Sequence, residues 1–278
     1  MNSSTHSQAG QSGGKPITLA ELARMKAAGE KVACLTAYDA SFAALEERAG
    51  IEVVLVGDSL GMVIQGEGST IPVTLADMVY HSRIVAAGLQ RPLLIADLPF
   101  LSFASPRDAL ASARRLMQEG GAQMVKLEGG EAYLDTVRHL SDNGVPVCAH
   151  IGLQPQQVHK LGGYKVQGRT DTQARQLQRE ARLLEEAGAD MLLLECVPKS
   201  LAATITVAAK VPVIGIGAGP DTDGQILVIY DILGIATGVK PRFVKNFMAE
   251  ADHVEAAVAA YVAAVKSGAY PRAEHSFS

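Results

Sequence analysis

The sequence contains no tryptophan, few other aromatic residues and only three cysteines among its 278 residues. A small, odd number of cysteines argues against a disulfide-stabilised secreted scaffold. Cys34, Cys148 and Cys196 lie within or beside apolar segments, where single thiols usually pack as small hydrophobic side chains. We therefore expect reduced, catalytically inert cysteines and a cytoplasmic protein.

The chain also lacks a strong charge of either sign and any long apolar segment. Its net charge is −4, with acidic and basic residues mixed, which argues against binding to nucleic acid or an anionic membrane. No segment approaches the ~20 apolar residues of a transmembrane helix. Residues 1–15 are polar and lack the apolar centre of a signal peptide, so we expect a disordered tail at 1–15 and one catalytic domain at 16–278.

Short apolar runs are what the sequence has in abundance. Eight of them alternate with stretches of helical composition, which is typical of a parallel sheet covered by helices. Eight such units predict an α/β protein with a closed (β/α)8, or TIM, barrel, whose chemistry lies at the C-terminal ends of the strands. The expected strands are Val32–Tyr38, Val53–Asp58, Pro92–Leu98, Met124–Glu128, Pro146–His150, Met191–Glu195, Val211–Gly217 and Ile226–Leu233.

Two further segments affect the ends of this barrel. Thr18 and Glu21 have the spacing of a capping box, which predicts an extra helix before the first strand that plugs the N-terminal end. Gly152–Thr170 is the longest irregular segment and follows the fifth strand, so we expect a mobile lid over the catalytic end.

Lys126 and Glu128 are two residues apart in the fourth strand and therefore share a face. Their neighbours Val125 and Leu127 take the opposite face, toward the covering helices. The two charges should thus point into the barrel, where an isolated charge would cost several kcal/mol. Salt bridges to neighbouring strand ends and a functional role are both open interpretations of this pair.

Carboxylates also end the two preceding strands. Asp58 and Asp97, with Glu128, should converge on one rim and would repel one another unless a cation lay among them. An all-oxygen ligand set suits a hard ion such as Mg²⁺. A single strand-end aspartate is often only a helix N-cap, but three on consecutive strands favour a metal site.

The remaining candidates lie on the fifth and sixth strands. Glu195 ends an apolar run, so burial should raise its pKa and make it a plausible general base. The alternative is an ion pair with a rim Lys or Arg. His150 lies between Lys126 and Glu195 in strand order, which favours contact with substrate over a merely satisfied polar group. The glycine-rich turn Gly215–Gly224 is a weak candidate for phosphate binding, because a tight turn alone would explain it.

Together these residues resemble the ketopantoate hydroxymethyltransferase family. The resemblance runs from about Ile17 to the C-terminus, and the order of the motifs is more specific than any one of them. The matching segments are LTAYDASFA, VGDSLGMVIQGEGSTIPVTLADMVYH, ADLPFLSF, VKLEGG, AHIGLQPQ, GGYKVQGR, GIGAGPDTDGQILV, PRFVKNF and the terminal EHSF.

The resemblance implies a Mg²⁺-dependent (β/α)8 enzyme that forms a homo-oligomer, commonly a decamer. It would transfer a one-carbon unit from 5,10-methylenetetrahydrofolate to 3-methyl-2-oxobutanoate, giving 2-dehydropantoate. By resemblance the metal-site residues are Asp58, Asp97 and Glu128, the 2-oxo acid is held by Asp58, Ser59, Asp97 and Lys126 with His150 nearby, and Glu195 accepts the proton.

Three other functions remain to be distinguished. Another Mg²⁺-enolate enzyme, of the phosphoenolpyruvate mutase/isocitrate lyase type, would share the fold and the metal but not the folate. A lysine-dependent aldolase would use Lys126 as a Schiff-base nucleophile, although three flanking acids disfavour the neutral amine that this chemistry needs. A non-catalytic barrel would have no need for so many inward-facing charges.

Overall fold

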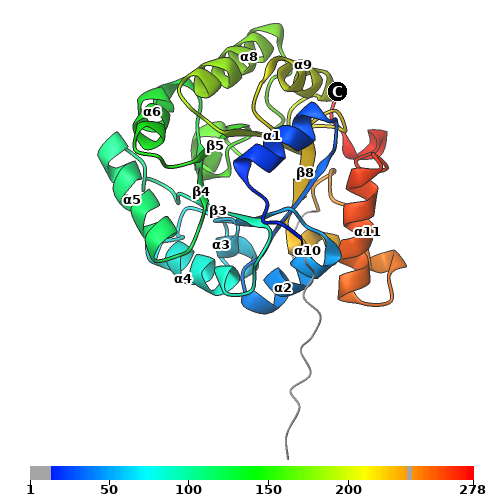
Figure 1. Cartoon of the computed structure of the whole chain (residues 1–278). Helices are drawn as coiled ribbons and strands as arrows, with labels where there is room; N and C mark the ends of the chain where they lie inside the picture. The colour runs from blue at the N-terminus through cyan, green and yellow to red at the C-terminus, as the bar shows by residue number, and fades with distance from the viewer. Residues whose placement is uncertain (1–13, 237–239) are drawn as a thin grey trace, which may run out of the picture.

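Eight parallel strands close into a barrel in which each strand pairs with its neighbours in the sequence and β1 pairs with β8 (Figure 1). The structure is a computed structural model and describes residues 14–236 and 240–278. It confirms the predicted (β/α)8 fold. The strands are β1 Val32–Thr36, β2 Val53–Val56, β3 Leu93–Asp97, β4 Met124–Glu128, β5 Val147–Gly152, β6 Met191–Glu195, β7 Val213–Ile216 and β8 Gly224–Leu227.

Helices surround the barrel and cover the outer face of its sheet (Figure 1). The larger ones are α2 Ala40–Ala49, α4 Leu75–Ala86, α5 Pro106–Gln118, α6 Leu134–Asp142, α8 Asp171–Glu186, α9 Lys199–Ala208 and α11 Val254–Lys266. Local sequence explains where several of them begin. Thr74 forms a full capping box with Asp77 at the start of α4, and Ser105 caps α5 ahead of Pro106.

Strand residues alternate between two cores. Val125 and Leu127 of β4 belong to the outer core beneath the helices, as predicted. Met124 belongs to an inner core inside the barrel, and Lys126 faces the same interior. This division fixes which side chains reach the mouth of the barrel, because only the inward-facing set does.

The N-terminal helix α1 (Leu19–Ala27) closes one end of the barrel (Figure 1). Its buried residues Leu22 and Met25 join the inner core, which agrees with the predicted plug. The predicted capping box forms only in half. Thr18 accepts a hydrogen bond from the backbone N–H of Glu21, but the Glu21 carboxylate pairs with Arg24, a charge-assisted partner.

The eighth predicted strand was wrong in its bounds. The strand begins at Gly224 and ends at Leu227, and the apolar residues beyond it form the short helix α10 (Ile229–Ile232). Ile229 donates its backbone N–H to Thr36 Oγ1, which turns the chain out of the sheet. Short apolar runs do not distinguish a buried strand from a buried helix, so periodicity alone could not separate the two parts.

Several other bounds differ by a few residues. Tyr38, Asp58 and Leu98 lie beyond the strands that were predicted to contain them, and the seventh strand is shorter than Val211–Gly217. The segment Gly152–Thr170 is also less irregular than expected, since it contains the 3-10 turn η2 (Pro155–Gln157) and the helix α7 (Val158–Leu161). The structure does not test the predicted mobility of this segment.

The predicted tail lies largely outside the described residues, which begin at residue 14. Within residues 14–236 and 240–278, no helix is both long enough and apolar enough to cross a membrane. The three cysteines are free and buried, as expected.

Candidate active site

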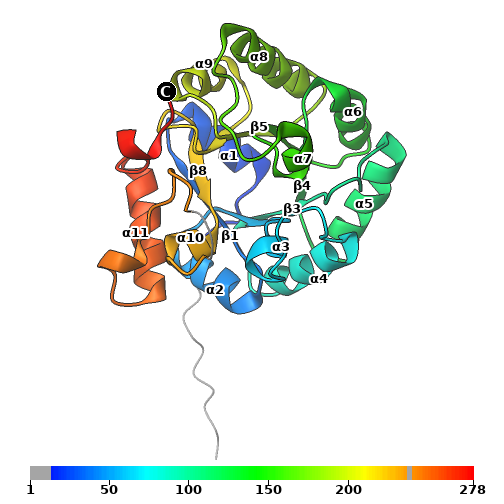
Figure 2. The same ribbon diagram turned by 180° about the vertical axis from the view of Figure 1, so that it is seen from behind.

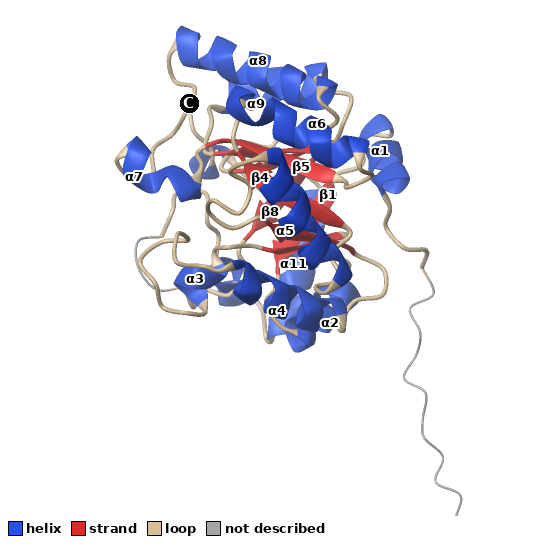
Figure 3. Ribbon diagram, turned by 90° about the vertical axis from the view of Figure 1, so that its left-hand side faces the viewer, coloured by secondary structure: helices blue, strands red, loops and turns tan. Residues whose placement is uncertain are grey.

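The predicted site residues gather at the C-terminal end of the barrel, opposite α1. Figure 2 shows this end, where α3 (Leu60–Val63), α7 and α10 lie, and Figure 3 shows α3 and α7 at the opposite end from α1. Asp58 follows β2, Asp97 ends β3, Lys126 and Glu128 lie on β4, His150 lies on β5 and Glu195 ends β6. Their side chains are brought together because consecutive strands are neighbours in the barrel.

Lys126 occupies the centre of this group and is 4% exposed. Its Nζ lies 3.1 Å from Asp97 Oδ1, 3.9 Å from Glu128 Oε1 and 3.2 Å from His150 Nδ1. Burial alone would lower the pKa of Lys126, but the negative charges of Asp97, Glu128 and Asp58 together outweigh it and raise the pKa. The amine is therefore held as an ammonium ion, which disfavours the Schiff-base alternative.

Asp58 and Asp97 lie against each other. The backbone N–H of Asp58 donates to Asp97 Oδ2 at 3.0 Å. Burial, and then the charge of Asp97, raise the pKa of Asp58 to about 7. Asp97 Oδ1 is buried and receives no hydrogen bond from any described residue, because its contact with Lys126 lacks hydrogen-bond alignment. Gly57 leaves room for the Ser59 hydroxyl beside this pair, since a Cβ at residue 57 would be 2.8 Å from Ser59 Oγ.

His150 connects Lys126 to Glu195. Burial, and then the charge of Lys126, lower the pKa of His150 well below its usual range, so the imidazole is neutral. The ammonium of Lys126 donates to Nδ1, which assigns the ring proton to Nε2. Nε2 faces Glu195 Oε2 at 3.2 Å, although the angle is not that of a hydrogen bond.

Glu195 combines a free carboxylate with a raised pKa. Burial raises its pKa to about 7, and Lys126 partly opposes this shift. No lysine or arginine pairs with it among the described residues, so the structure does not support the alternative of a rim ion pair. The backbone at Glu195 and at the next residue is constrained by a hydrogen bond and an unusual φ angle. Leu153 N–H donates to the Glu195 carbonyl at 2.8 Å, and the next residue, Cys196, has a φ of 48°, a region that favours glycine.

Sequence reasoning missed two residues here. Tyr38 follows β1, and its hydroxyl lies 2.8 Å from Ser59 Oγ, so it orients the only hydroxyl among the predicted ligands. Gln156 is buried and bonds both Asp58 and Glu128. Tyr38 ends the apolar run VACLTAY, so the rule that singled out Asp58 could have found it. Gln156 lies in a loop and carried no comparable signal.

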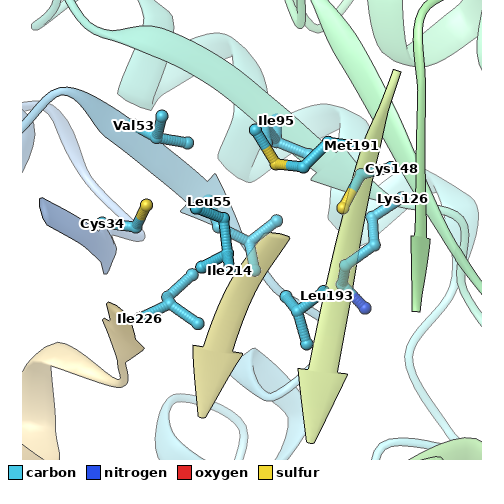
Figure 4. A pocket seen from close by; sticks show the side chains of 10 residues that line it. All are labelled: Cys34, Val53, Leu55, Ile95, Lys126, Cys148, Met191, Leu193, Ile214 and Ile226. Atoms are coloured by element: carbon cyan, nitrogen blue, oxygen red, sulfur yellow. The ribbon is translucent and has the colours of Figure 1, made fainter. Parts of the chain in front are cut away.

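The barrel interior beneath the site is a packed core and not a substrate channel. Its void has a volume of about 10 Å³, roughly the space of one water molecule. Lys126 supplies the only charged side chain of the lining, as Figure 4 shows. The lining residues are Cys34, Val53, Leu55, Ile95, Lys126, Cys148, Met191, Leu193, Ile214 and Ile226. Substrate must therefore bind above this layer, at the mouth.

The glycine-rich turn after β7 has a packing explanation. Gly217 and Gly219 have φ values of 61° and 83°, and a Cβ at Gly219 would be 2.5 Å from the Lys199 side chain. The tight turn accounts for these glycines without a phosphate.

Two carboxylates of the site are suited to hold a divalent cation together with oxygens from substrate and water. In the described part of the chain, no three His, Cys, Asp or Glu side chains are arranged to hold a metal by themselves. Mg²⁺, however, usually binds one or two protein carboxylates and completes its shell with substrate oxygens and water. Asp58 and Asp97 can meet this need, because they offer hard oxygen donors on neighbouring residues of the site and Asp97 Oδ1 has no hydrogen bond from the described residues.

The fold resembles solved enzymes at low sequence identity. A phosphonomutase-like protein from Burkholderia cenocepacia superposes with a TM-score of 0.62 at 17% identity, over 78% of this chain and 94% of that one. A phosphoenolpyruvate phosphomutase from Streptomyces platensis gives a TM-score of 0.58 at 15% identity, over 78% and 82%. A phosphonopyruvate hydrolase, whose structure contains oxalate and Mg²⁺, gives 0.58 at 16% identity, over 76% and 80%. These likenesses support the barrel fold alone.

Curated relatives are far more similar. A 3-methyl-2-oxobutanoate hydroxymethyltransferase of Alkalilimnicola ehrlichii is 57% identical over 263 residues, which cover 95% of each chain. The corresponding enzyme of Nitrosococcus oceani is 57% identical over 261 residues, covering 94% of this chain and 99% of that one. The sequence profile described as ketopantoate hydroxymethyltransferase matches residues 16–273. The chain therefore belongs to the ketopantoate hydroxymethyltransferase family.

Proposed function

We propose that this enzyme transfers a hydroxymethyl group from 5,10-methylenetetrahydrofolate to 3-methyl-2-oxobutanoate, giving 2-dehydropantoate, the first committed step of pantothenate biosynthesis. Family membership supports the activity. The observation that supports the chemistry is Glu195, a carboxylate whose side chain is only 14% exposed, whose pKa is raised to about 7 and which faces the His150–Lys126 pair.

Binding of the 2-oxo acid is assigned to Asp58, Ser59, Asp97 and Lys126, with His150 beside them. The ammonium of Lys126 offers a permanent positive charge to an anionic substrate, because its pKa is raised. Tyr38 holds the Ser59 hydroxyl toward the site. Asp58, Asp97 and Glu128 are the proposed metal-site residues for Mg²⁺, and Glu128 Oε1 also lies 3.9 Å from Lys126 Nζ. When bound, the ion would act as a Lewis acid toward the 2-oxo acid.

Glu195 would remove the proton from C3 of the 2-oxo acid. A base with a pKa near neutrality combines a sufficient ionised fraction with useful basicity. The neutral His150 ring places its Nε2 3.2 Å from Glu195 Oε2, on the side of the carboxylate that faces Lys126. Lys126 would stabilise the carbanion that remains, and this carbon would form a bond to the methylene carbon of the folate. Water would supply the hydroxyl oxygen as the bond between the methylene carbon and the folate nitrogen breaks and tetrahydrofolate is released.

The test is incorporation of solvent deuterium at C3 of 3-methyl-2-oxobutanoate, measured by NMR with Mg²⁺ and again with EDTA, before and after addition of the folate. We expect metal-dependent exchange, followed by 2-dehydropantoate once the folate is present. Exchange without transfer would point to another electrophile, as in the mutase/lyase alternative. An absence of exchange with Mg²⁺ would contradict the proposal.

We also propose, from the family resemblance, a cytoplasmic homo-oligomer, commonly a decamer. Sedimentation velocity of the purified chain tests the subunit number, and a monomer at micromolar concentration would contradict it.

A further inference from the structure

Gln156 is an unusual residue of the segment that follows β5. The side chains of this segment are mostly half-buried or exposed, and between residues 154 and 170 only Gln156 and Gly168 are buried. Gln156 lies in the turn η2 and is 4% exposed. A glutamine buried at the start of a surface segment must form hydrogen bonds through its polar atoms, because leaving them buried without partners would be costly.

Those partners are the carboxylates of the site. The backbone N–H of Gln156 donates to Glu128 Oε2 at 2.9 Å. Its side-chain Nε2 donates to Asp58 Oδ2 and to the Leu98 carbonyl, both at 2.9 Å. Both side-chain contacts are acceptors, which fixes the orientation of the amide. One residue from the loop after β5 thus reaches the ends of β2, β3 and β4.

An amide is well suited to this position. It supplies two donors and no charge, so it holds one oxygen of Asp58 without neutralising the carboxylate. A glutamate would place another negative charge against Asp58 and the Leu98 carbonyl, and a lysine would compete with a bound cation. A methionine has a similar length but offers no hydrogen-bond donor.

We infer that Gln156 is a positioning residue that couples the segment 157–170 to the cation and substrate site. It fixes the orientation of Asp58 and Glu128 for their ligand, and the same hydrogen bonds hold the root of the segment over the mouth. Coupling of this kind is reciprocal, so a ligand that orders Asp58 must also reduce the opening of the segment. The inference rests on the proposed function only for the identity of the ligand.

The test compares Gln156→Met with Gln157→Met. Gln157 lies in the same turn, but among residues 14–236 and 240–278 its side-chain amide bonds only to the nearby Gln154, so it is the matched control. Amide hydrogen exchange of residues 158–168 is measured by mass spectrometry without ligand, and calorimetry measures binding of Mg²⁺ in the presence of 3-methyl-2-oxobutanoate. Thermal unfolding checks that each variant is folded.

For Gln156→Met we expect exchange in residues 158–168 to rise about 10-fold without ligand, because the side-chain hydrogen bonds to the Asp58 carboxylate and the Leu98 carbonyl are lost while the backbone bond to Glu128 remains. Affinity for Mg²⁺ with the oxo acid should fall about 10- to 100-fold, the range seen for outer-shell partners of metal ligands. KM for the oxo acid should rise more than kcat falls. Gln157→Met should match the unsubstituted enzyme in each measurement.

Wild-type exchange and wild-type affinity in Gln156→Met would overturn the inference, and so would equal effects in both variants. A wild-type enzyme that binds neither Mg²⁺ nor the oxo acid would instead overturn the proposed function. In that case the ligand-free exchange measurement still decides whether Gln156 anchors the segment.

Discussion

Lys126 Nζ lies 3.1 Å from Asp97 Oδ1, and the two residues are direct neighbours in the β3–β4 register. Both side chains are almost fully buried, so the pair places a charge of each sign at the base of the site. Buried ion pairs of this kind contribute little net stability, but loss of one partner is costly. This relationship leads to the first prediction.

Lys126→Met should lower the free energy of unfolding by about 3–5 kcal/mol in metal-free buffer, because Asp97 and Glu128 lose their counter-charge. Affinity for the 2-oxo acid should also be lost. Urea unfolding measures the change in stability, and calorimetry measures the change in affinity.

Borohydride should trap no adduct between wild-type enzyme and the oxo acid, and an adduct on Lys126 would revive the aldolase alternative.

Glu195→Gln should reduce deuterium incorporation at C3 by roughly 100-fold or more, since the amide cannot accept the proton. Binding of Mg²⁺ and the oxo acid should remain, because Glu195 lies away from Asp58 and Asp97. Glu186→Gln, on the exposed end of α8 where Glu186 pairs with Arg182, is the matched control. Exchange at the wild-type rate in Glu195→Gln would show that another group is the base.

The pH dependence of exchange should follow Glu195. Burial raises its pKa to about 7, and the base acts only when deprotonated, so the rate should rise with pH through a midpoint near 7. The free-enzyme midpoint is read from kcat/KM between pH 5 and 9. A profile that is flat over this interval, or one that falls with increasing pH, would contradict the assignment.

Glu46 should make the free energy of unfolding depend on pH, independently of the active site. It lies buried in α2, its two carboxylate oxygens have no hydrogen-bond partner in the described part of the chain, and burial raises its pKa well above the usual value. The folded state therefore retains a proton that the unfolded chain releases above about pH 4.3. Its contribution to stability is present below that pH and is lost as pH rises, by up to about 1.4 kcal/mol per pH unit until the folded-state pKa is reached.

Glu46→Gln should remove this slope, so it should gain stability relative to the wild type as pH rises, with a larger difference at pH 8 than at pH 5. Urea unfolding at the two pH values measures it. Asp135→Asn is the control, because the Asp135 side chain is 91% exposed. Equal pH slopes for wild type and Glu46→Gln would mean that Glu46 is ionised in the folded protein.

Much of the site followed from the sequence because strand periodicity has a simple geometric consequence. Residues two apart on β4 share a face, so the alternation along this strand alone predicts that Lys126 and Glu128 point into the barrel. The fourth and sixth strands were predicted with their observed bounds. The eighth was not, because an apolar run is compatible with both β8 and α10.

The sequence by itself determined the barrel, the strand ends that carry charge and the family, because these depend on local pattern and order along the chain. Only the tertiary structure decided the partners across the barrel. Gln156 is 98 residues from Asp58 in the chain, yet its Nε2 donates to Asp58 Oδ2 at 2.9 Å. His150 lies between Lys126 and Glu195, with Nδ1 toward Lys126 and Nε2 toward Glu195. Such pairings depend on how closed strands and a returning loop meet in space, and no local pattern encodes them.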